Sequence, residues 1–176
     1  ALKSYEESCD LKYMSLRYFN ACGAHLDGSI GEMHKPETHL IPLVLQVASG
    51  RKKHIEIFGD DYPTQDGTCV RDYVHVMDIV EAHILAMENL MNTNKSQVFN
   101  IGNNKGFSVN QIIQMAKEIT KVDIPFKIQG RRKGDPAELI ADNKKIINLL
   151  NWNPKYSDLE TIVKSAWNWE KTLKIK

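Results

Sequence analysis

Short strand patterns alternate with helix patterns along most of the chain, and this alternation constrains the fold more than any other feature. Apolar and polar residues alternate at 13–19 and 70–76, and shorter runs typical of strands occur at 55–58, 97–101 and 126–128. Helical spacing or capping signals predict helices over 1–8, 40–49, 77–91, 108–119, 144–150 and from 157 onward. Short strands between helices favour an α/β or α+β fold.

Local signals also predict where several elements begin and end. Gly50 follows the apolar helix of 40–49 in the position favoured just beyond a helix. Capping-box patterns at 108–111 and 157–160 predict two helix starts. The glycine-rich segment 20–35 predicts a long loop, and the apolar residues of 77–91 recur at helical spacing, at Val80, Ile84, Met87 and Met91.

Charge and cysteine content exclude several classes of protein. The 176 residues carry 23 Lys and Arg against 22 Asp and Glu, so no global field attracts nucleic acid or an anionic membrane. No apolar run approaches the roughly 20 residues that a membrane-spanning helix needs. The widely spaced cysteines Cys9, Cys22 and Cys69 form no disulfide framework and predict reduced thiols in a cytoplasmic protein.

We find no complete catalytic device in the sequence. The glycines of 23–31 lack the tight spacing of a dinucleotide-binding fingerprint, and the six histidines include no tight pair of metal ligands. No tyrosine is followed four residues later by the lysine that would acidify its phenol. We therefore predict no catalytic residue and no metal site. Because the sequence opens inside a helix pattern, we expect the chain to be a piece of a longer protein.

Local cationic groups are the remaining candidates for chemistry. Arg71 lies inside an apolar strand pattern, so we expect it to be partly buried and to need an anion, either a phosphate or the carboxylate of Asp72 or Asp78. The run 131–133 places three cations beside a turn. Solvent-exposed charge is the simpler interpretation of that run, although arginine matches two phosphate oxygens well.

Several motifs together resemble one enzyme family. They occur in order along essentially the whole chain, at Leu16–Asn20, Gly23–His25, Ile57–Thr64, Asp66–Thr68, Val70–Asp78 and Arg131–Asp135. These segments resemble the UDP-glucose 4-epimerases of the extended short-chain dehydrogenase/reductase family. The stretch from Asp60 to Asp78 is the most specific part of this resemblance.

The resemblance implies a fold and a division of the chain. It favours the C-terminal substrate-binding α/β domain of such an enzyme, with one edge strand of the NAD-binding Rossmann sheet attached. Residues 1–24 would be the tail end of the NAD-binding domain. Residues 25–176 would form the UDP-sugar substrate-binding region, and this division allows some of its segments to return to the Rossmann sheet. The family's NAD fingerprint and its catalytic tyrosine and lysine would lie outside this chain.

The resemblance also implies site residues, by position in the motifs. Arg71 and Arg132 would clamp the pyrophosphate, Asp135 would hold the ribose hydroxyls, and the backbone N–H of Leu40 would meet a phosphate. Leu139 matches a sugar-pocket position whose size affects tolerance of N-acetyl sugars. The implied substrate-binding residues are Asn20, His39, Leu40, Glu56, Phe58, Arg71, Arg132, Asp135 and Leu139, and the implied cofactor-binding residues are Tyr18 and Ala21.

The implied activity is the interconversion of UDP-galactose and UDP-glucose through a 4-keto intermediate, with bound NAD as the cofactor. We expect this chain alone to be inactive and not to hold NAD. The family implies a homodimer, with no nucleic-acid or membrane partner. Two alternatives remain: a related NAD-dependent nucleotide-sugar epimerase or decarboxylase, and a stand-alone nucleotide-binding module.

Overall fold

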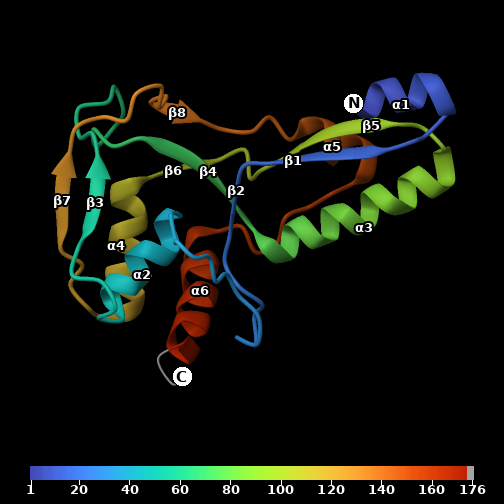
Figure 1. The fold of residues 1–176 in the computed structure, drawn as a ribbon. Helices are drawn as coiled ribbons and strands as arrows, with labels where there is room; N and C mark the ends of the chain where they lie inside the picture. Colours follow the sequence, from blue (N-terminus) through green and yellow to red (C-terminus); the bar gives the residue numbers. More distant parts are fainter. Residues whose placement is uncertain (174–176) are drawn as a thin grey trace.

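The computed structural model describes residues 1–173, which form an elongated arm joined to a thicker body (Figure 1). The arm holds strand β1 (Met14–Tyr18) beside strand β5 (Gln97–Ile101), with helices α1 (Leu2–Cys9), α3 (Val76–Thr93) and α5 (Lys144–Leu150). β1 and β5 are parallel, with Met14 opposite Gln97. Their core consists of Val74, Ile79, Ala82, Ala86, Phe99, Ile101, Ile146, Leu150 and Trp152.

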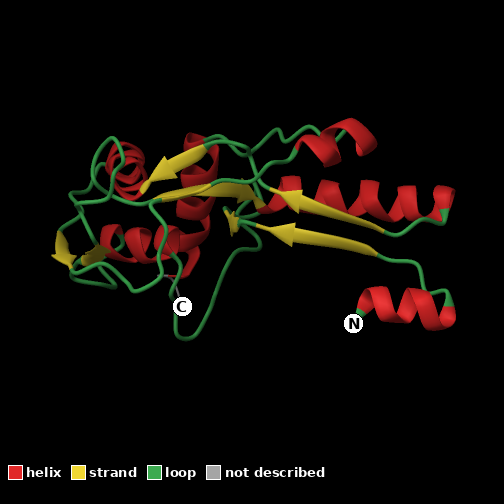
Figure 2. Ribbon diagram, turned by 90° about the horizontal axis from the view of Figure 1, so that it is seen from above, coloured by secondary structure: helices red, strands yellow, loops and turns green. Residues whose placement is uncertain are grey.

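The body is built from three helices that pack on one another and on a strand pair. These are α2 (Leu40–Ala48), α4 (Val109–Thr120) and α6 (Leu159–Leu173), beside the parallel strands β3 (Ile55–Phe58) and β7 (Phe126–Gln129). Seen from above, the helices of the body lie at one end of the molecule and the arm extends to the other (Figure 2). The body therefore has its own hydrophobic core, separate from that of the arm.

A short central sheet connects the two parts. Strand β4 (Val70–His75) lies at its middle, parallel to β2 (Asn20–Cys22) and to β8 (Glu138–Leu139), and antiparallel to β6 (Gly106–Ser108). β2 directly follows β1 along the chain, and α3 directly follows β4. The segment predicted as a loop from residue 20 thus begins with a strand, because its backbone pairs with β4.

Most predicted elements are present, and one predicted helix start is wrong. Ser108 forms the expected capping box of α4: its hydroxyl accepts from the N–H of Gln111, whose side chain accepts from the N–H of Ser108. At α6, however, the N–H of Thr161 donates to Asp158, so Asp158 is the cap. Ser157 instead donates its hydroxyl to Asp78, because the turn before α6 packs against the start of α3.

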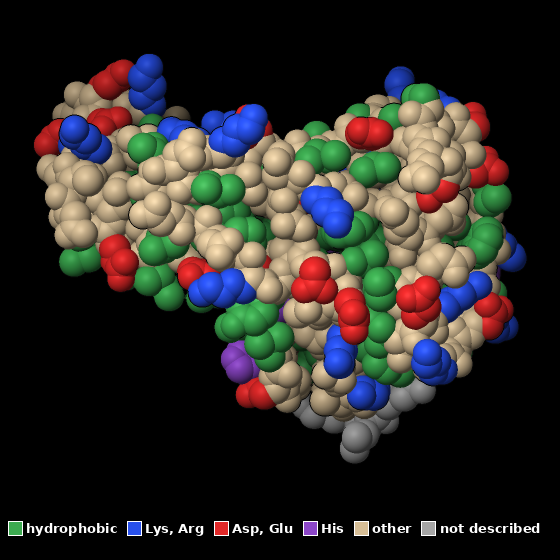
Figure 3. Space-filling model, turned by 180° about the vertical axis from the view of Figure 1, so that it is seen from behind, with side chains coloured by type: hydrophobic (Ala, Val, Ile, Leu, Met, Phe, Trp, Pro, Cys, Tyr) green, Lys and Arg blue, Asp and Glu red, His purple; other side chains and the backbone are tan. Residues whose placement is uncertain are grey.

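The apolar spacing predicted helix α3 correctly, but these residues do not form its buried face. Val80, Ile84, Met87 and Met91 are 51%, 48%, 56% and 77% exposed. The buried positions of the helix are Asp78, Ile79, Ala82 and Ala86. Hydrophobic side chains are visible along the lower edge of the arm in Figure 3. Among the helices that the structure describes, none combines the length and apolarity that a membrane crossing requires.

The arm contains two parallel strands, and not only the one edge strand that the resemblance implied. β5 comes from the region 25–176 and returns beside β1, and the intervening α3 packs on β1. A strand, a helix and a second parallel strand are the parts of a parallel α/β unit. The boundary after residue 24 remains a prediction.

A buried histidine joins the central sheet to α3 and α6. His75 is 0% exposed; its Nδ1 accepts from the N–H of Met77, and its Nε2 lies 2.9 Å from the hydroxyl of Ser165. That hydroxyl donates to the carbonyl of Ile162, so it can accept an Nε2–H. A Cβ at Gly23, whose φ is +82°, would lie 2.5 Å from the ring. His75 is therefore a neutral, tightly packed imidazole.

We expect stability to fall below about pH 6.5 because His75 must gain a proton. Burial lowers the pKa of His75 from its usual value, although Asp78 and Asp158 oppose this shift. A lowered folded pKa contributes stability that is complete above the unfolded pKa of about 6.5 and is lost as pH falls through the folded value. One proton changes the free energy of unfolding by at most about 1.4 kcal/mol per pH unit.

Urea unfolding between pH 5 and 8 measures this dependence. The variant His75→Gln should have a flatter profile below about pH 6.5 than the wild type. His25→Ala is the matched control, because the His25 side chain is 43% exposed and, among residues 1–173, its ion-pair partner is Asp27 alone. Parallel wild-type and His75→Gln profiles would contradict the assignment.

Candidate functional site

A cleft of about 360 Å³ lies where the body meets the central sheet. Its walls come from β2, from the start of α2, from β3 and β4, and from the segment 132–135. It brings together residues that are up to 115 positions apart (135 − 20). The cleft contains all but one of the predicted substrate-binding residues: Asn20, His39, Leu40, Glu56, Phe58, Arg71, Arg132 and Asp135.

Arg71 is the most buried cation of the cleft, with a side chain that is 13% exposed. Its Nη1 donates to the carbonyl of Val70 at 2.7 Å, and its Nη2 donates to Asp135. The sequence left the anion open between a phosphate and the carboxylates of Asp72 and Asp78. In the structure the carboxylate that pairs with Arg71 is that of Asp135, and the prediction of Asp72 or Asp78 is wrong. Those two carboxylates instead accept hydrogen bonds from backbone N–H groups elsewhere.

Arg132 also lines the cleft, but it is held there by an aromatic ring and not by a carboxylate. It is exposed, and its guanidinium carbon lies 3.8 Å from the ring centroid of Phe58. Within residues 1–173 it forms no ion pair, so its donors are available to a ligand. Its neighbour Arg131 turns away: it pairs with Asp61 and lies over the ring of Tyr62. The basic run thus contributes to the cleft only Arg132, the arginine that the family resemblance implied.

The first turn of α2 supplies backbone donors to the same cleft. His39 caps the helix with extended backbone, and Leu40 is the first helical residue. The N–H groups of a first helical turn have no partner within the helix, and the helix dipole favours an anion there. Pro42 suits this turn because it lacks a backbone N–H. The backbone N–H of Leu40 is therefore placed where it could donate to a phosphate in the cleft, as the resemblance implied.

A second hollow of about 720 Å³ lies on the other side of β2. Asn20, Ala21 and Cys22 line both hollows, so this strand is the wall between them. Tyr18 also lines the second hollow, and its hydroxyl lies 2.6 Å from Nε2 of His83. The two predicted cofactor residues, Tyr18 and Ala21, thus share one hollow beside the cleft.

Leu139 is the predicted substrate-binding residue that the cleft does not include. It lies on β8 opposite Arg71 and is 49% exposed. The position of Leu139 is therefore adjacent to the cleft's most buried cation, but its side chain is not part of the cleft lining.

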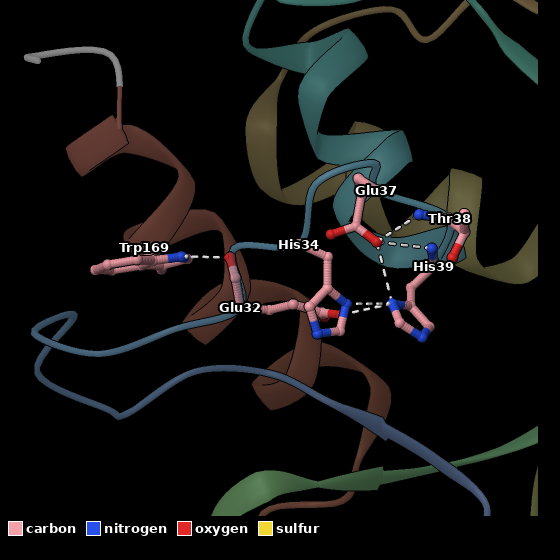
Figure 4. A network of polar contacts seen from close by, with 6 residues as sticks. All are labelled: Glu32, His34, Glu37, Thr38, His39 and Trp169. Atoms are coloured by element: carbon pink, nitrogen blue, oxygen red, sulfur yellow. Dashed lines mark hydrogen bonds and ion pairs between the residues drawn. The ribbon is translucent and has the colours of Figure 1, made fainter.

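Sequence reasoning missed several residues near these hollows. Lys52 and Tyr73 line the cleft. Outside it, Glu32 and His34 meet His39 and Glu37 in a polar cluster (Figure 4). Lys52 and His34 lie in loops, where no periodic pattern marks a functional position. The sequence signal for the cluster was only the local concentration of acidic and histidine residues over 32–39, which matches no known metal-binding spacing.

Comparison with known proteins identifies relatives of this chain. Residues 1–102 match the NAD dependent epimerase/dehydratase family. The chain is similar to the UDP-glucose 4-epimerase of Halalkalibacterium halodurans, with 54% identity over 94% of this chain and 50% of the relative. It is also similar to a crystal structure of a UDP-glucose 4-epimerase, with 48% identity and a TM-score of 0.95 over 98% of this chain and 53% of the other.

A further solved relative contains ligands. This UDP-glucose 4-epimerase from Bifidobacterium longum, in complex with NAD⁺ and UDP, is 34% identical. The match covers 97% of this chain and 50% of the relative, with a TM-score of 0.88. The chain therefore spans about half the length of the relatives it matches.

These matches require a correction to the predicted fold class. The α/β fold with Rossmann-like parallel strands is confirmed. The narrower prediction of a C-terminal substrate-binding domain is withdrawn. The matches cover about half of each relative, and the family match extends over residues 1–102, well beyond the 24 residues that we assigned to an NAD-binding domain.

The family assignment rests on both the sequence and the structure. The family match covers more than half of the chain, and the fold agrees closely with solved relatives of 34% and 48% identity. The chain belongs to the NAD dependent epimerase/dehydratase family.

Proposed function

We propose that the chain supplies the UDP-sugar-binding cleft of an NAD-dependent UDP-glucose 4-epimerase, which interconverts UDP-galactose and UDP-glucose through a 4-keto intermediate. The observation that carries this proposal is the convergence of eight motif-derived residues in one cleft. Those residues come from separate elements, so their meeting is a property of the fold and not of sequence proximity. The cytoplasmic location and the homodimer remain predictions.

The cleft has the chemistry to hold a nucleoside diphosphate. Arg71, Arg132 and Lys52 contribute positive charge, and the start of α2 adds unpaired backbone donors. Arginine can donate two parallel hydrogen bonds to phosphate oxygens. On β3, Glu56 and Phe58 line the cleft and offer a strand edge to a flat base. The Phe58 ring already stacks with the guanidinium of Arg132.

The pairing of Arg71 with Asp135 fits this proposal. Two of the five guanidinium donors are used by Val70 and Asp135, which leaves others for a phosphate. Asp135 holds the guanidinium in place and can accept from a sugar hydroxyl through its other oxygen. We therefore propose that Arg71 contacts the pyrophosphate and that Asp135 contacts the ribose.

The second hollow fits one end of a dinucleotide. Tyr18 and Ala21 would contact the nicotinamide there, across β2 from the sugar cleft. When bound, NAD supplies a hydride acceptor for C4 of the hexose. Strand β2, which lines both hollows, separates the nicotinamide position from the sugar position. The described residues include no tyrosine with a lysine four residues on, so we propose no catalytic base among them.

The arrangement suits a reaction in which the hexose must turn over in the site. A sugar that rotates cannot be held tightly, so binding energy must come from the distant nucleotide. Charge-assisted hydrogen bonds each contribute roughly 1.5–3 kcal/mol. Two arginines and a helix N-terminus at the pyrophosphate therefore anchor the substrate while the hexose stays mobile.

Calorimetric titration of the purified chain tests the proposal. We expect one site that binds UDP and UDP-glucose, and at least about tenfold weaker binding of ADP-glucose, because a pocket built around uracil leaves its polar groups unpaired with another base. Arg131→Ala is the matched control, since Arg131 belongs to the same basic run but lies outside the cleft.

A turnover assay with UDP-galactose and excess NAD⁺ completes the test. We expect no UDP-glucose from the chain alone, because no catalytic tyrosine and lysine pair is present in it. Absence of UDP binding by the folded chain would contradict the cleft assignment. Sustained turnover would instead contradict our account of where the catalytic residues lie.

A further inference from the structure

Two histidines and two glutamates converge just before α2. The ligand atoms of Glu32, His34, Glu37 and His39 all lie within 4.8 Å of one another (Figure 4). Nδ1 of His39 is 2.6 Å from Oε1 of Glu32, 3.0 Å from Oε1 of Glu37 and 3.2 Å from Nδ1 of His34. Nδ1 of His34 is 3.1 Å from the same Glu32 oxygen. The described residues contain no other such group of three or more potential ligands.

Protons alone satisfy this arrangement poorly. Nδ1 of His39 faces three acceptors, but an imidazole nitrogen carries one proton. The two facing Nδ1 atoms cannot both donate to each other, and the carboxylates are acceptors only. If both Nδ1 atoms carry a proton, their N–H groups face each other at 3.2 Å and compete for the same Glu32 oxygen. With both Nδ1 atoms unprotonated, the lone pairs of all four groups lie close enough together for one cation to bind them. Partial burial raises the pKa of Glu32, Glu37 adds to this effect, and the two histidines oppose it.

The surrounding structure holds these ligands in place. The Glu32 carbonyl accepts from the indole N–H of Trp169 on α6 at 2.8 Å. Gly31 lies so close to that indole that a Cβ there would be 2.2 Å from the ring. Glu37 accepts from the backbone N–H groups of Thr38 and His39 at 2.7 and 2.8 Å. Glu32 is thus held by a contact with α6, and Glu37 by the backbone at the start of α2.

The ligand spacing matches a four-coordinate ion. Bonds of about 2.0–2.1 Å in tetrahedral geometry place neighbouring ligand atoms roughly 3.3 Å apart. Four of the six separations between these atoms are 2.6–3.2 Å and need only small outward movements to reach this value. The other two lie within 4.8 Å. Two imidazoles and two carboxylates suit Zn²⁺, and the two negative charges balance the ion.

We propose that Glu32, His34, Glu37 and His39 form a Zn²⁺ site at the amino end of α2. The site lies where the two hollows meet: Glu37 and His39 also line the cleft, and Glu32, His34 and His39 line the second hollow. Access is open, because the side chains of His34 and His39 are 58% and 51% exposed. The site does not depend on the proposed epimerase activity, and its test uses neither UDP nor NAD.

Titration of the metal-free chain with ZnCl₂ against a chromophoric chelator tests the proposal. We expect one equivalent of Zn²⁺ to bind, and His34→Ala and Glu32→Gln each to weaken its affinity at least about tenfold. His34 is chosen because it is exposed and does not line the cleft. His25→Ala should leave Zn²⁺ affinity unchanged, since His25 has the single carboxylate partner Asp27.

Visible spectra of the chain with Co²⁺ give an independent readout. Four-coordinate Co²⁺ absorbs far more strongly than the six-coordinate ion, and we expect strong bands that Zn²⁺ removes and that His34→Ala lacks. Thermal unfolding without metal should be the same for wild type and His34→Ala, which shows that the variant folds. Zn²⁺ binding unaffected by His34→Ala, absence of binding, or six-coordinate spectra would each overturn the assignment.

Discussion

Replacing Asp72 with alanine is expected to lower the free energy of unfolding by about 3 to 5 kcal/mol. Asp72 is 0% exposed and lies on β4 beside Arg71. Its carboxylate accepts from the backbone N–H groups of Asn103, Asn104 and Ala141 at 2.7, 3.0 and 3.1 Å. Alanine leaves all three donors without this partner, and each unsatisfied buried donor costs about 1–3 kcal/mol unless water enters.

The local packing explains why nearby atoms cannot easily compensate. A Cβ on Gly102 would lie 2.7 Å from Oδ2 of Asp72 and 2.5 Å from the side chain of Ala141, so the backbone approaches the carboxylate closely. Burial raises the pKa of Asp72, whereas the three N–H donors oppose this effect. The carboxylate thus ties β4 to two loops that precede β6 and α5.

Urea unfolding at pH 7 measures the loss of stability. Asp123→Ala is the matched control, because the Asp123 side chain is 80% exposed and, within the part of the chain that the structure describes, forms an ion pair with Lys117 alone. Removing that surface pair should change the free energy of unfolding by less than about 1 kcal/mol. Equal, small losses in the two variants would show that the bonds to Asp72 contribute little net stability.

The sequence predicted elements where the signal was local. The helix over 144–150 and the strand at 55–58 have the predicted bounds, because periodicity and flanking turns depend on neighbours in the chain. The capping box at Ser108 was equally local, since its two bonds join residues three apart. The pattern at Ser157 looked the same, but a tertiary bond to Asp78 recruits that hydroxyl.

Side-chain partners and buried faces were harder to predict, because they depend on which elements meet. The exposed stripe of α3 has the same spacing as a buried face, and only the position of β1 and β5 decides between them. Likewise, Asp135 is 64 residues from Arg71, whereas Asp72 and Asp78 were expected because they are near in sequence. Closeness in sequence therefore did not identify the carboxylate that pairs with Arg71.

The candidate cleft was predictable through the motif resemblance and not through composition. The near-neutral net charge of the chain does not indicate a local anion-binding site. Eight of the residues that the resemblance implied nevertheless line one cleft. The cluster of Glu32 and His34 was missed for a different reason. Its ligands follow no known metal-binding spacing, and the turn that brings them together cannot be inferred from periodicity.

Replacing Arg71 with alanine is expected to weaken UDP binding by about 1.5–3 kcal/mol, or about 10- to 150-fold in Kd. Arg71 is a cation in a partly desolvated wall of the cleft, so its contacts are screened less than those of a surface charge. The variant also frees the Asp135 carboxylate, whose charge would repel a pyrophosphate. Both effects act in the same direction.

Calorimetry with a set of variants separates these two effects. Arg71→Lys keeps the charge but loses the planar fork of donors, so we expect an intermediate affinity. The double variant Arg71→Ala with Asp135→Asn removes the arginine together with the repulsion, and should bind UDP more tightly than Arg71→Ala alone. Arg131→Ala should bind UDP like the wild type, because its guanidinium pairs with Asp61 outside the cleft.

The alternative is that Arg71 serves only to pair with Asp135 and stabilise β4 against the segment before β8. Under that alternative, Arg71→Ala would lower the free energy of unfolding, and the folded protein would bind UDP with unchanged affinity. Measuring unfolding and UDP binding on the same preparation distinguishes the two. A phosphate-binding role requires the affinity to fall in protein that is still folded, and to fall more for Arg71→Ala than for Arg71→Lys, since only the latter keeps a positive charge in that wall of the cleft.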